Sequence, residues 1–571
     1  MQPNIVIHSK LALPRASRIA FLIALVTVLA VVGCAVPVSQ VSPPVATQVP
    51  AVVATQPPAP AATQAPAQPT EVAAQEPTSA IADELVIAVG IEPVSMDAWR
   101  AFAETGGPGF RSVVEQLVAR DFDTGQVVPL LATSWKWIDD KTIEFTLRQG
   151  LTFHDDSPFN AEAAAASINH TFDEKNAFDL LDFLGSMSAE AVDEFTLRVS
   201  TPEPDPILLE KMEFVSLGSA QQLAADPDSY STNLIGTGPY RFAEWRRGDS
   251  LIYETNPDWW GIGKPEEAGG QQSFQRVVYR ILQKDQVRTA ALLADEIDVA
   301  QYVTPEQCAQ LEANDGTHCE SAPSVETIFI RMDTNSPMFS DRRVRQAFQL
   351  AIDKDLIVET LLGGVAEPSG QIVNATATGH NPNIKPYAYD PEQAKTLLAE
   401  AAAAGVPVDM PVTLGARNAV FPGIEEVLQA VANMLTEVGF TVTTQFYDAE
   451  GFGKVMLVNI KDVPEDRNFV AVHGHGNEIL DYATSYRFYY SCEGILSTYC
   501  NPKADEIWQA ALPLSGAERD QKLQELNQFV HDDVAVGYIA HLSLAYGVSD
   551  DLDWKVKLDH RLLAKEMKPV K

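Results

Sequence analysis

Strand and helix patterns alternate along most of this 571-residue chain, and the alternation restricts the fold to the mixed α/β class. The clearest example lies between residues 410 and 447. A strand pattern, MPVTLGA, is followed by an amphipathic helix pattern, IEEVLQAVANMLTEVG, and then by a second strand pattern, FTVTTQFY. A strand, a helix and a strand in this order form one βαβ unit.

The same alternation occurs on both sides of this unit. The segment TIEFTLRQGLTF alternates apolar and polar residues like a half-buried strand, and Asn160 then stands where a helix cap is expected. Asp341 is placed to cap one helix over residues 342–364, whose apolar residues recur at helical spacing. Asp390, followed by proline, opens another helix that closes at Gly405.

The first eighty residues indicate where the protein works. A short basic region precedes an apolar run over residues 19–32, which suits the core of a signal peptide. The run ends in VVGC, which resembles the lipobox of bacterial lipoproteins and implies a signal peptide over 1–33 and a lipidated Cys34. Residues 35–80 contain ten prolines and neither Lys nor Arg, so 34–80 is predicted to be a disordered tether. An ordinary secretory signal and a mucin-like stalk are the alternatives.

Charge and cysteine content restrict the partners and the compartment. The formal net charge of −36 argues against binding to nucleic acid or to anionic lipid head groups. Four cysteines remain beside Cys34, and an oxidising compartment favours two disulfides that close short loops, Cys308 with Cys319 and Cys492 with Cys500. Four cysteines allow three pairings, and none of the spacings is the CxxC of a structural zinc site.

Sequence motifs for catalysis are missing. The chain contains no GxSxG, no HExxH, no phosphate loop and no GxGxxG after a strand. We therefore predict no catalytic residue, no metal site and no cofactor. A secreted hydrolase that uses Glu478 and Asp481 is a distant alternative, and a surface adhesin or sensor is another.

Four segments resemble extracytoplasmic solute-binding proteins of family 5, which serve importers of peptides, nickel and related solutes. They begin with LATSWKWIDDKTIEFTLRQGLTFHDDSPFNAEAAAASI at residues 131–168 and continue, in the family's order, at 236–261, 294–300 and 341–368. The resemblance covers roughly residues 83–571. It implies an α/β, two-lobed periplasmic-binding-protein-like fold with mixed sheets, an extra inserted subdomain and a ligand cleft between the lobes.

The resemblance also suggests where the lobes begin and end. The first lobe is expected over residues 81–325, including an inserted subdomain at roughly 114–216. The second lobe is expected over 326–545, and residues 546–571 return to the first lobe. The two lobes of such proteins close around their ligand by a hinge movement.

The segment GHGNEILDYATSYRFYYSC, residues 474–492, corresponds to the block in which peptide binders of this family carry an acid for the peptide's α-ammonium group. By that resemblance Glu478 is the amine anchor, and His475 stands where the family usually has tryptophan. Asp481 belongs to the same candidate site. Arg417, next to the position of the family's carboxylate-binding arginine, is the candidate for the other end of a peptide.

The rival interpretation is a metal chelate. His473 and His475 lie two apart on a predicted strand and therefore project from one face, where Glu478 could join them. The chain is thus expected to be a monomeric, lipid-anchored extracytoplasmic receptor that delivers di- or oligopeptides to an ABC permease. A receptor for nickel, a metal chelate or another small solute such as an oligosaccharide is the alternative.

Overall fold

The computed structural model describes residues 82–570, apart from 94, 98–108, 123, 177, 419 and 465. Pro77–Lys571 form one compact unit. The predicted signal peptide, Cys34 and tether lie outside the described residues. Within the described part of the chain, no helix is both long and apolar enough to cross a membrane.

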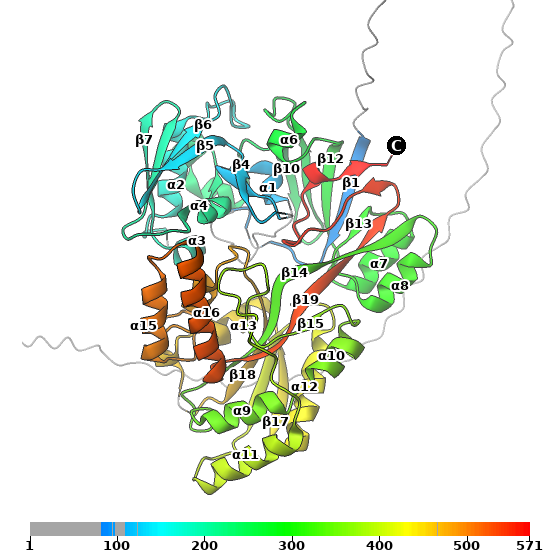
Figure 1. The fold of residues 1–571 in the computed structure, drawn as a ribbon. Coiled ribbons are helices and arrows are strands. Elements are labelled where there is room, and N and C mark those ends of the chain that lie inside the picture. Colours follow the sequence, from blue (N-terminus) through cyan, green and yellow to red (C-terminus); the bar gives the residue numbers. More distant parts are fainter. Residues whose placement is uncertain are drawn as a thin grey trace, which may run out of the picture. The chain divides into compact units, whose positions relative to one another are not determined.

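One eleven-stranded mixed sheet organises the body (Figure 1). Its strands, in spatial order, are β10 (Tyr240–Arg246), β11 (Ser250–Thr255), β12 (Phe274–Ile281), β1 (Ala82–Val89), β13 (Val299–Ala300), β19 (Gly537–Ser549), β14 (Thr317–Met332), β18 (Phe469–Gly476), β16 (Val412–Arg417) and β17 (Val442–Tyr447); β15 (Glu367–Pro368) pairs with β19. We call the part built on β10 to β13 and β1 the first lobe, and the part built on β16 to β18 the second lobe.

Two long antiparallel strands, β14 and β19, belong to both lobes. In the first lobe β19 pairs with β13, and in the second lobe β14 pairs with β18. The register between β14 and β19 shifts between Pro323 and Thr327, where regular pairing is interrupted. The lobe boundary predicted at 325/326 thus falls inside one continuous strand, near this irregularity.

The inserted subdomain contains a four-stranded antiparallel sheet of β5 (Ala132–Trp137), β6 (Thr142–Leu147), β8 (Thr196–Ser200) and β7 (Ser188–Asp193). Helix α2 (Ala161–Thr171) packs beside it, and Asn160 caps this helix as predicted, by accepting from the backbone N–H of Ala163 at 2.9 Å. The predicted strand also forms, because Ile143 and Phe145 of β6 are completely buried.

The second lobe contains the predicted βαβ unit. Strands β16 and β17 are parallel, and α12 (Ile424–Val438) connects them and buries its apolar face. Helix α11 (Pro391–Ala403) begins after Asp390, which accepts from the backbone N–H of Gln393 at 2.9 Å. The predicted caps at Asn160 and Asp390 therefore form. Asp341 also caps the helix that follows it, accepting from the backbone N–H of Arg343 at 2.8 Å.

The prediction of a single helix over residues 342–364 is wrong. The chain forms α9 (Arg342–Leu350) and α10 (Lys354–Leu361) instead. Asp353 interrupts the helix because its side chain caps α10, accepting from the N–H of Leu356 at 3.0 Å. The buried ammonium group of Lys354 donates to the carbonyl of Gln349 at 3.0 Å and so satisfies the end of α9.

The remaining helices and short strands complete the layers. They are α1 (Phe110–Val113), β2 (Glu115–Gln116), β3 (Val118–Arg120), β4 (Val127–Pro129), α3 (Asp179–Leu184), α4 (Leu208–Lys211), β9 (Ser216–Leu217), α5 (Ala220–Ala225), α6 (Pro265–Ala268), α7 (Asp285–Leu293), α8 (Pro305–Glu312), α13 (Ala449–Met456), α14 (Tyr482–Tyr489), α15 (Pro502–Ala511), α16 (Gly516–Asp532), β20 (Leu552–Asp553) and β21 (Lys568–Pro569). After β19 the chain stays with the first lobe, where the hydroxyl of Tyr279 donates to the carbonyl of Leu562 at 2.8 Å.

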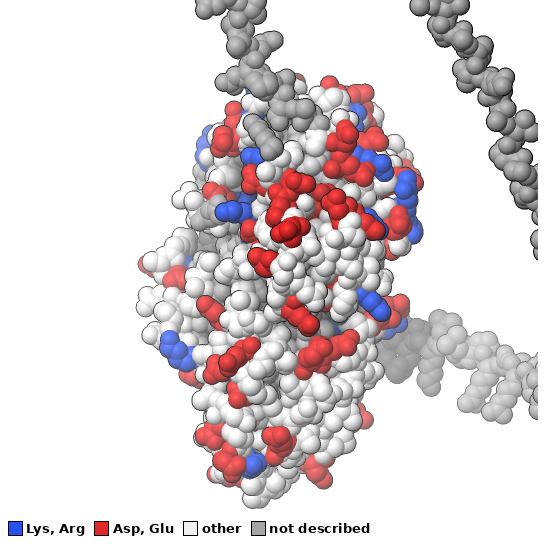
Figure 2. All heavy atoms as spheres, turned by 90° about the vertical axis from the view of Figure 1, so that its right-hand side faces the viewer, with Lys and Arg blue, Asp and Glu red and all other residues white. Residues whose placement is uncertain are grey.

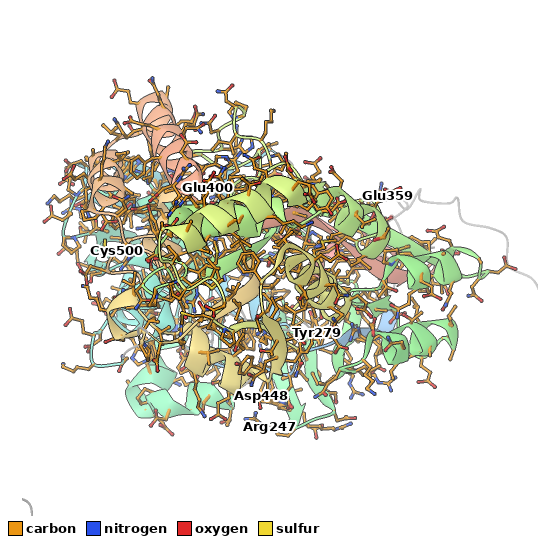
Figure 3. All side chains as sticks on the ribbon, turned by 90° about the horizontal axis from the view of Figure 1, so that it is seen from below. Arg247, Tyr279, Glu359, Glu400, Asp448 and Cys500 are labelled. Atoms are coloured by element: carbon orange, nitrogen blue, oxygen red, sulfur yellow. A yellow bond between two sulfur atoms is a disulfide. The ribbon has the colours of Figure 1, made fainter. Side chains whose placement is uncertain are left out.

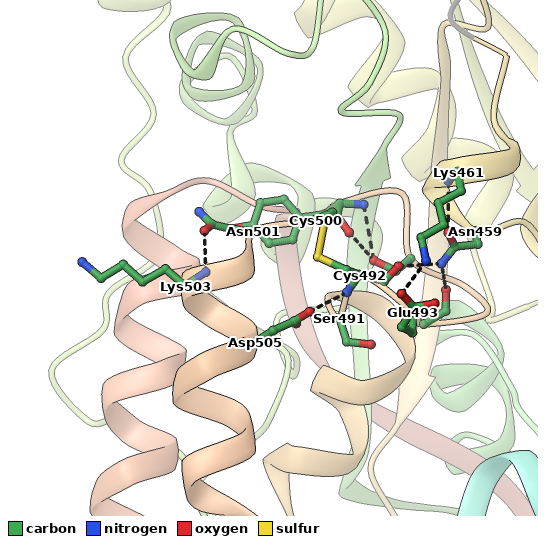
Figure 4. Close-up of a disulfide and its surroundings, with 12 residues drawn as sticks. Asn459, Lys461, Ser491, Cys492, Glu493, Cys500, Asn501, Lys503 and Asp505 are labelled. Carbon is green, nitrogen blue, oxygen red and sulfur yellow. Dashed lines mark hydrogen bonds and ion pairs between the residues drawn. A yellow bond between two sulfur atoms is a disulfide. The ribbon is translucent and has the colours of Figure 1, made fainter. Parts of the chain in front are cut away.

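Both disulfides that the sequence favoured are present in the structure. Cys308–Cys319 joins α8 to β14, and Cys492–Cys500 closes the loop after α14 (Figure 4). The second loop is also held from both sides. The N–H of Cys492 donates to Asp505 at 3.2 Å, and Asn459 donates to the carbonyl of Cys492 at 3.1 Å.

Candidate ligand-binding site

A cavity of about 1270 Å³ lies between the two lobes. The first lobe contributes residues after β1 and from α7 and α8, the second lobe contributes the ends of β16 and β18, and the C-terminal segment contributes residues 559–561. This volume exceeds the roughly 300–1,000 Å³ of sites for drug-sized molecules. The cavity is therefore large enough for a solute of several residues.

The second-lobe side of the cavity is formed by β18 and the turn that follows it. His473, His475 and Glu478 all line the cavity, as does Arg417 at the end of β16. The structure thus brings together three of the four residues proposed from the sequence, Glu478, His475 and Arg417. Whether each of them touches a ligand stays a prediction.

Asp481 lies elsewhere. It does not line the cavity, because the turn at residues 477–480, in which Leu480 has a φ of 60°, directs the chain into α14. The carboxylate of Asp481 caps α14 and accepts from Arg519 at 2.7 and 3.0 Å, with both side chains only 4% exposed. The structure therefore places Asp481 outside the cavity lining, with its charge paired to Arg519.

A second cavity carboxylate, Glu326 on β14, was missed in the sequence. Gly476 is its neighbour across the β14–β18 pair, and a Cβ atom on that glycine would lie 3.1 Å from Oε1 of Glu326 and 2.5 Å from Oε1 of Glu478. The two carboxylates therefore approach the same point, and a side chain at 476 would displace them. No local motif marks Glu326, because its importance comes only from strand pairing with a segment 150 residues later.

Burial changes the acidity of both carboxyl groups. Desolvation raises the pKa of Glu478 above its usual value. It also raises the pKa of Glu326 to about 7, with repulsion from Glu478 as the second cause and attraction to Arg417 acting in the opposite direction. Two neighbouring carboxylates that are partly shielded from water cannot both ionise without a cost, and this cost appears in the raised pKa of Glu326.

The two histidines form part of an aromatic wall. The His473 ring lies 5.7 Å from the Phe329 ring and 5.6 Å from the Phe452 ring, and His475 lies 4.8 Å from Tyr489. Burial lowers the pKa of both histidines to about 3, so both rings are neutral near pH 7. The Nε2 atom of His475 also shares a hydrogen bond with the hydroxyl of Ser485 at 2.8 Å.

These histidines do not form a metal cage with other ligands. Among the described residues, no three His, Cys, Asp or Glu side chains are grouped so that they could hold a metal ion. His473 and His475 do share one face of β18, as the sequence predicts, since both rings contact Phe329. A metal ion already bound by its own chelating molecule could still be contacted by the two neutral imidazole rings.

A network of buried charges lies beside this wall. Glu213 is fully buried and accepts from Arg561 at 2.5 Å and from Arg120 at 3.2 Å, while Arg561 also pairs with Asp559 at 3.2 Å. Arg561 and Asp559 line the cavity. No local pattern marks these two residues, because the C-terminal segment reaches the cavity only through the tertiary fold of the first lobe.

The lobes touch each other at the edge of the cavity. Arg120 of the first lobe donates to the carbonyl of Ile479 at 3.4 Å, one residue after Glu478. Phe183 of the inserted subdomain stacks on Phe488 of α14, with ring centroids 5.5 Å apart and planes at 23°. Both phenylalanines line the cavity, so this contact forms part of its wall.

Comparison with known proteins places these features in a family. The sequence model described as "Bacterial extracellular solute-binding proteins, family 5 Middle" matches residues 126–496, which is more than half of the chain. A glutathione-binding protein, GsiB, of Pectobacterium atrosepticum is 27% identical over 369 residues, covering 64% of this chain and 69% of the relative. The dipeptide-binding protein of Escherichia coli K12 is 28% identical over 312 residues, covering 50% of this chain and 57% of the relative.

Solved structures share the fold. The dipeptide-binding protein of Pseudoalteromonas sp. SM9913, in complex with Met-Leu, superposes with a TM-score of 0.75 at 21% identity, covering 86% of this chain and 100% of that one. DppA of Helicobacter pylori, in complex with the peptide STSA, gives the same TM-score and identity and covers 86% and 99%. NikA of Staphylococcus aureus, in complex with Ni(L-His)2, gives 0.72 at 17%, covering 85% and 100%. The two-lobed fold, the cavity between its lobes and the match over residues 126–496 together show that this chain belongs to the bacterial extracellular solute-binding proteins of family 5.

Proposed function

We propose that the protein is the receptor of an ABC importer and that it captures peptides by their α-ammonium group at Glu478. One observation carries the proposal: an interlobe cavity of about 1270 Å³ has the half-buried carboxylate of Glu478 on its wall. A charge-assisted hydrogen bond is much stronger in such a dry site than at the surface. Two similar proteins, the dipeptide-binding protein of Escherichia coli and DppA of Helicobacter pylori in complex with a peptide, support peptides as the class of solute.

The acidic surface fits a solute with a cationic end. The face in Figure 2 carries many more Asp and Glu than Lys and Arg, in keeping with the formal charge of −36. Such a field favours the approach of cations over that of anions. Arg417, which lines the same cavity, is the proposed partner of the peptide's α-carboxylate.

The first experiment identifies the ligand directly. Native mass spectrometry of the purified chain should reveal a co-purifying peptide, and calorimetry with Met-Leu and Ser-Thr-Ser-Ala should give one site per chain. Glu478→Gln keeps the shape of the side chain and removes its charge, and losing one partner of a buried charged pair typically costs about 2–5 kcal/mol. Affinity should therefore fall at least tenfold.

Two controls separate charge from folding. Glu400 is an exposed acid on α11 (Figure 3), so Glu400→Gln removes the same charge far from the cavity and should bind like the wild type. N-acetylated peptides remove the charge from the other partner, and the variant with the acetylated peptide should lose less than the two effects added. If acetylation is harmless, the amine is not the anchor.

A metal chelate is the second candidate. The neutral rings of His473 and His475 on the cavity wall favour it, and NikA with Ni(L-His)2 shares the fold. Calorimetry with nickel and L-histidine decides between the two. If His475→Ala abolishes chelate binding while acetylation leaves peptide binding unchanged, the chelate becomes the ligand.

We propose that Cys34 is lipidated, that residues 34–80 tether the body to the membrane on the extracytoplasmic side, and that the loaded receptor docks on the permease without turning over its ligand. Cys34→Ser should move the protein from the membrane fraction to the supernatant. Recovery of the variant in the membrane pellet would contradict the anchor.

A further inference from the structure

Glu326 and Glu478 come from different strands and converge on one point in the cavity. A Cβ atom on Gly476 would lie 2.5 Å from an oxygen of Glu478 and 3.1 Å from an oxygen of Glu326, so a larger residue there would displace the ends of these side chains. The register pairs Glu326 with Gly476 across β14 and β18, which fixes this geometry in the backbone. A single cationic group that enters here meets both carboxylates.

The charged groups around the pair decide how it is neutralised when no ligand is present. Arg417 from β16 is the cation that acts on Glu326, whereas Arg561 acts on Glu478 and is already shared with Glu213 and Asp559. Arg111 is a further cation whose charge acts on Glu478. The histidines on β18 and the hydroxyls of Tyr302, Tyr489 and Tyr546 are uncharged near pH 7, because burial lowers the pKa of these histidines and raises that of these hydroxyls.

We propose that Glu326 and Glu478 form one cation subsite, in which Glu326 holds a proton while the cleft is empty and releases it to solvent when a ligand ammonium enters. The inference rests on the proposed function, since it deepens how the amine is recognised. No covalent bond changes: the ammonium keeps its three protons, Glu326 gives up one, and the net charge of the subsite stays constant. Glu326 thus acts as a specificity-determining residue beside the anchor.

The exchange makes binding depend on pH in a defined direction. The pKa of Glu326 is raised to about 7, so below neutrality a proton competes with the ligand for the subsite. Affinity for a cationic ligand should therefore rise with pH by up to about tenfold per unit between pH 5 and 7, and level off above that. A neutral ligand end should show no such rise.

Calorimetry of Met-Leu, or of Ser-Thr-Ser-Ala if it binds more tightly, tests the exchange at pH 6, where a free α-amino group with a pKa near 7.7–8.0 is fully protonated. Titrations in buffers of different ionisation enthalpy should show release of close to one proton per bound peptide. Glu326→Gln should still bind but release clearly fewer protons, and its affinity should rise less steeply from pH 5 to 7 than that of the wild type. Glu400→Gln should match the wild type.

A measurement on the wild type alone protects the test against a variant that misfolds. Infrared difference spectra of the empty protein at pH 6 should contain the band of a protonated carboxyl group, which disappears as the pH rises and when peptide is added. Peptide binding without proton release, or an empty protein with no such band at pH 6, overturns the inference and leaves the proposed function standing. If neither peptide binds, the peptide function and the exchange both fall.

Discussion

Replacing Asp481 by asparagine tests whether this residue supports the fold or contacts the ligand. Its carboxylate accepts two hydrogen bonds from Arg519, at 2.7 and 3.0 Å, and a third from the N–H of Ala483 at 2.9 Å. Asparagine keeps an oxygen for the helix cap, because Asn and Asp cap helices about equally well. Its NH2 group, however, would face the guanidinium, and the buried cation would lose its counter-charge.

The size of the effect follows from burial. Both side chains are only 4% exposed, and breaking a buried pair by removing one partner typically costs about 3–5 kcal/mol. Asp481→Asn should therefore lower the free energy of unfolding by about that amount. Asp481→Ala should lose about 1 kcal/mol more, because the cap of α14 also disappears. A double variant, Asp481→Asn with Arg519→Met, should recover part of the loss because no unpaired cation remains.

The assay is urea unfolding followed by tryptophan fluorescence, with peptide affinity measured separately where the variants are folded. The affinity should be close to that of the wild type, because Asp481 does not line the cavity. A loss of stability below about 1 kcal/mol together with a large loss of affinity would refute the reasoning. Asp481 would then be a ligand residue, as the sequence first indicated.

Three further outcomes are expected. Changing both Cys492 and Cys500 to serine should lower the free energy of unfolding by about 2–3 kcal/mol, because the disulfide no longer restricts the unfolded chain. Non-reducing peptide mapping of the wild type checks the bond, and free thiols at both positions would contradict the prediction. Phe183→Ala removes the ring stack between the lobes, which is worth about 0.5–1.5 kcal/mol, so the affinity for peptide should fall about two- to tenfold. Small-angle scattering should also show a more open ligand-free protein. If neither measurement changes, the stack does not stabilise the closed form. The rings of His473 and His475 should remain neutral at pH 5 in nuclear magnetic resonance spectra, because burial lowers their pKa to about 3. Since the unfolded chain takes up protons on these histidines below about pH 6.5, the free energy of unfolding should decrease as the pH falls below that value. Protonated rings in the folded protein at pH 5 would contradict this.

Local patterns in the sequence determined the elements and the class of fold. The βαβ unit around α12 and the caps at Asn160 and Asp390 depend on neighbours within one or two turns, so periodicity and cap residues suffice to predict them. The same local reasoning failed over residues 342–364. There the cap at Asp353 competes with a continuous helix, and the buried contact of Lys354 favours the break.

The candidate site could be predicted only in part. The block at residues 474–492 pointed to Glu478 and His475 because family resemblance preserves position along the chain, and both line the cavity. Asp481 stands three residues from Glu478, and sequence spacing could not show that one lines the cavity while the other pairs with Arg519. The turn at residues 477–480 places the two side chains in these different surroundings.

Tertiary structure alone decided which charges meet. Glu326 reaches Glu478 through the pairing of β14 with β18, and Arg561 reaches the cavity because the C-terminal segment returns to the first lobe. The physical reason is that a hydrogen bond or a Coulomb interaction depends on distance in space, whereas a sequence records only distance along the chain. The sequence by itself therefore determined the strands, helices and family of this protein, and the folded chain determined the acidity and partners of the groups in its cleft.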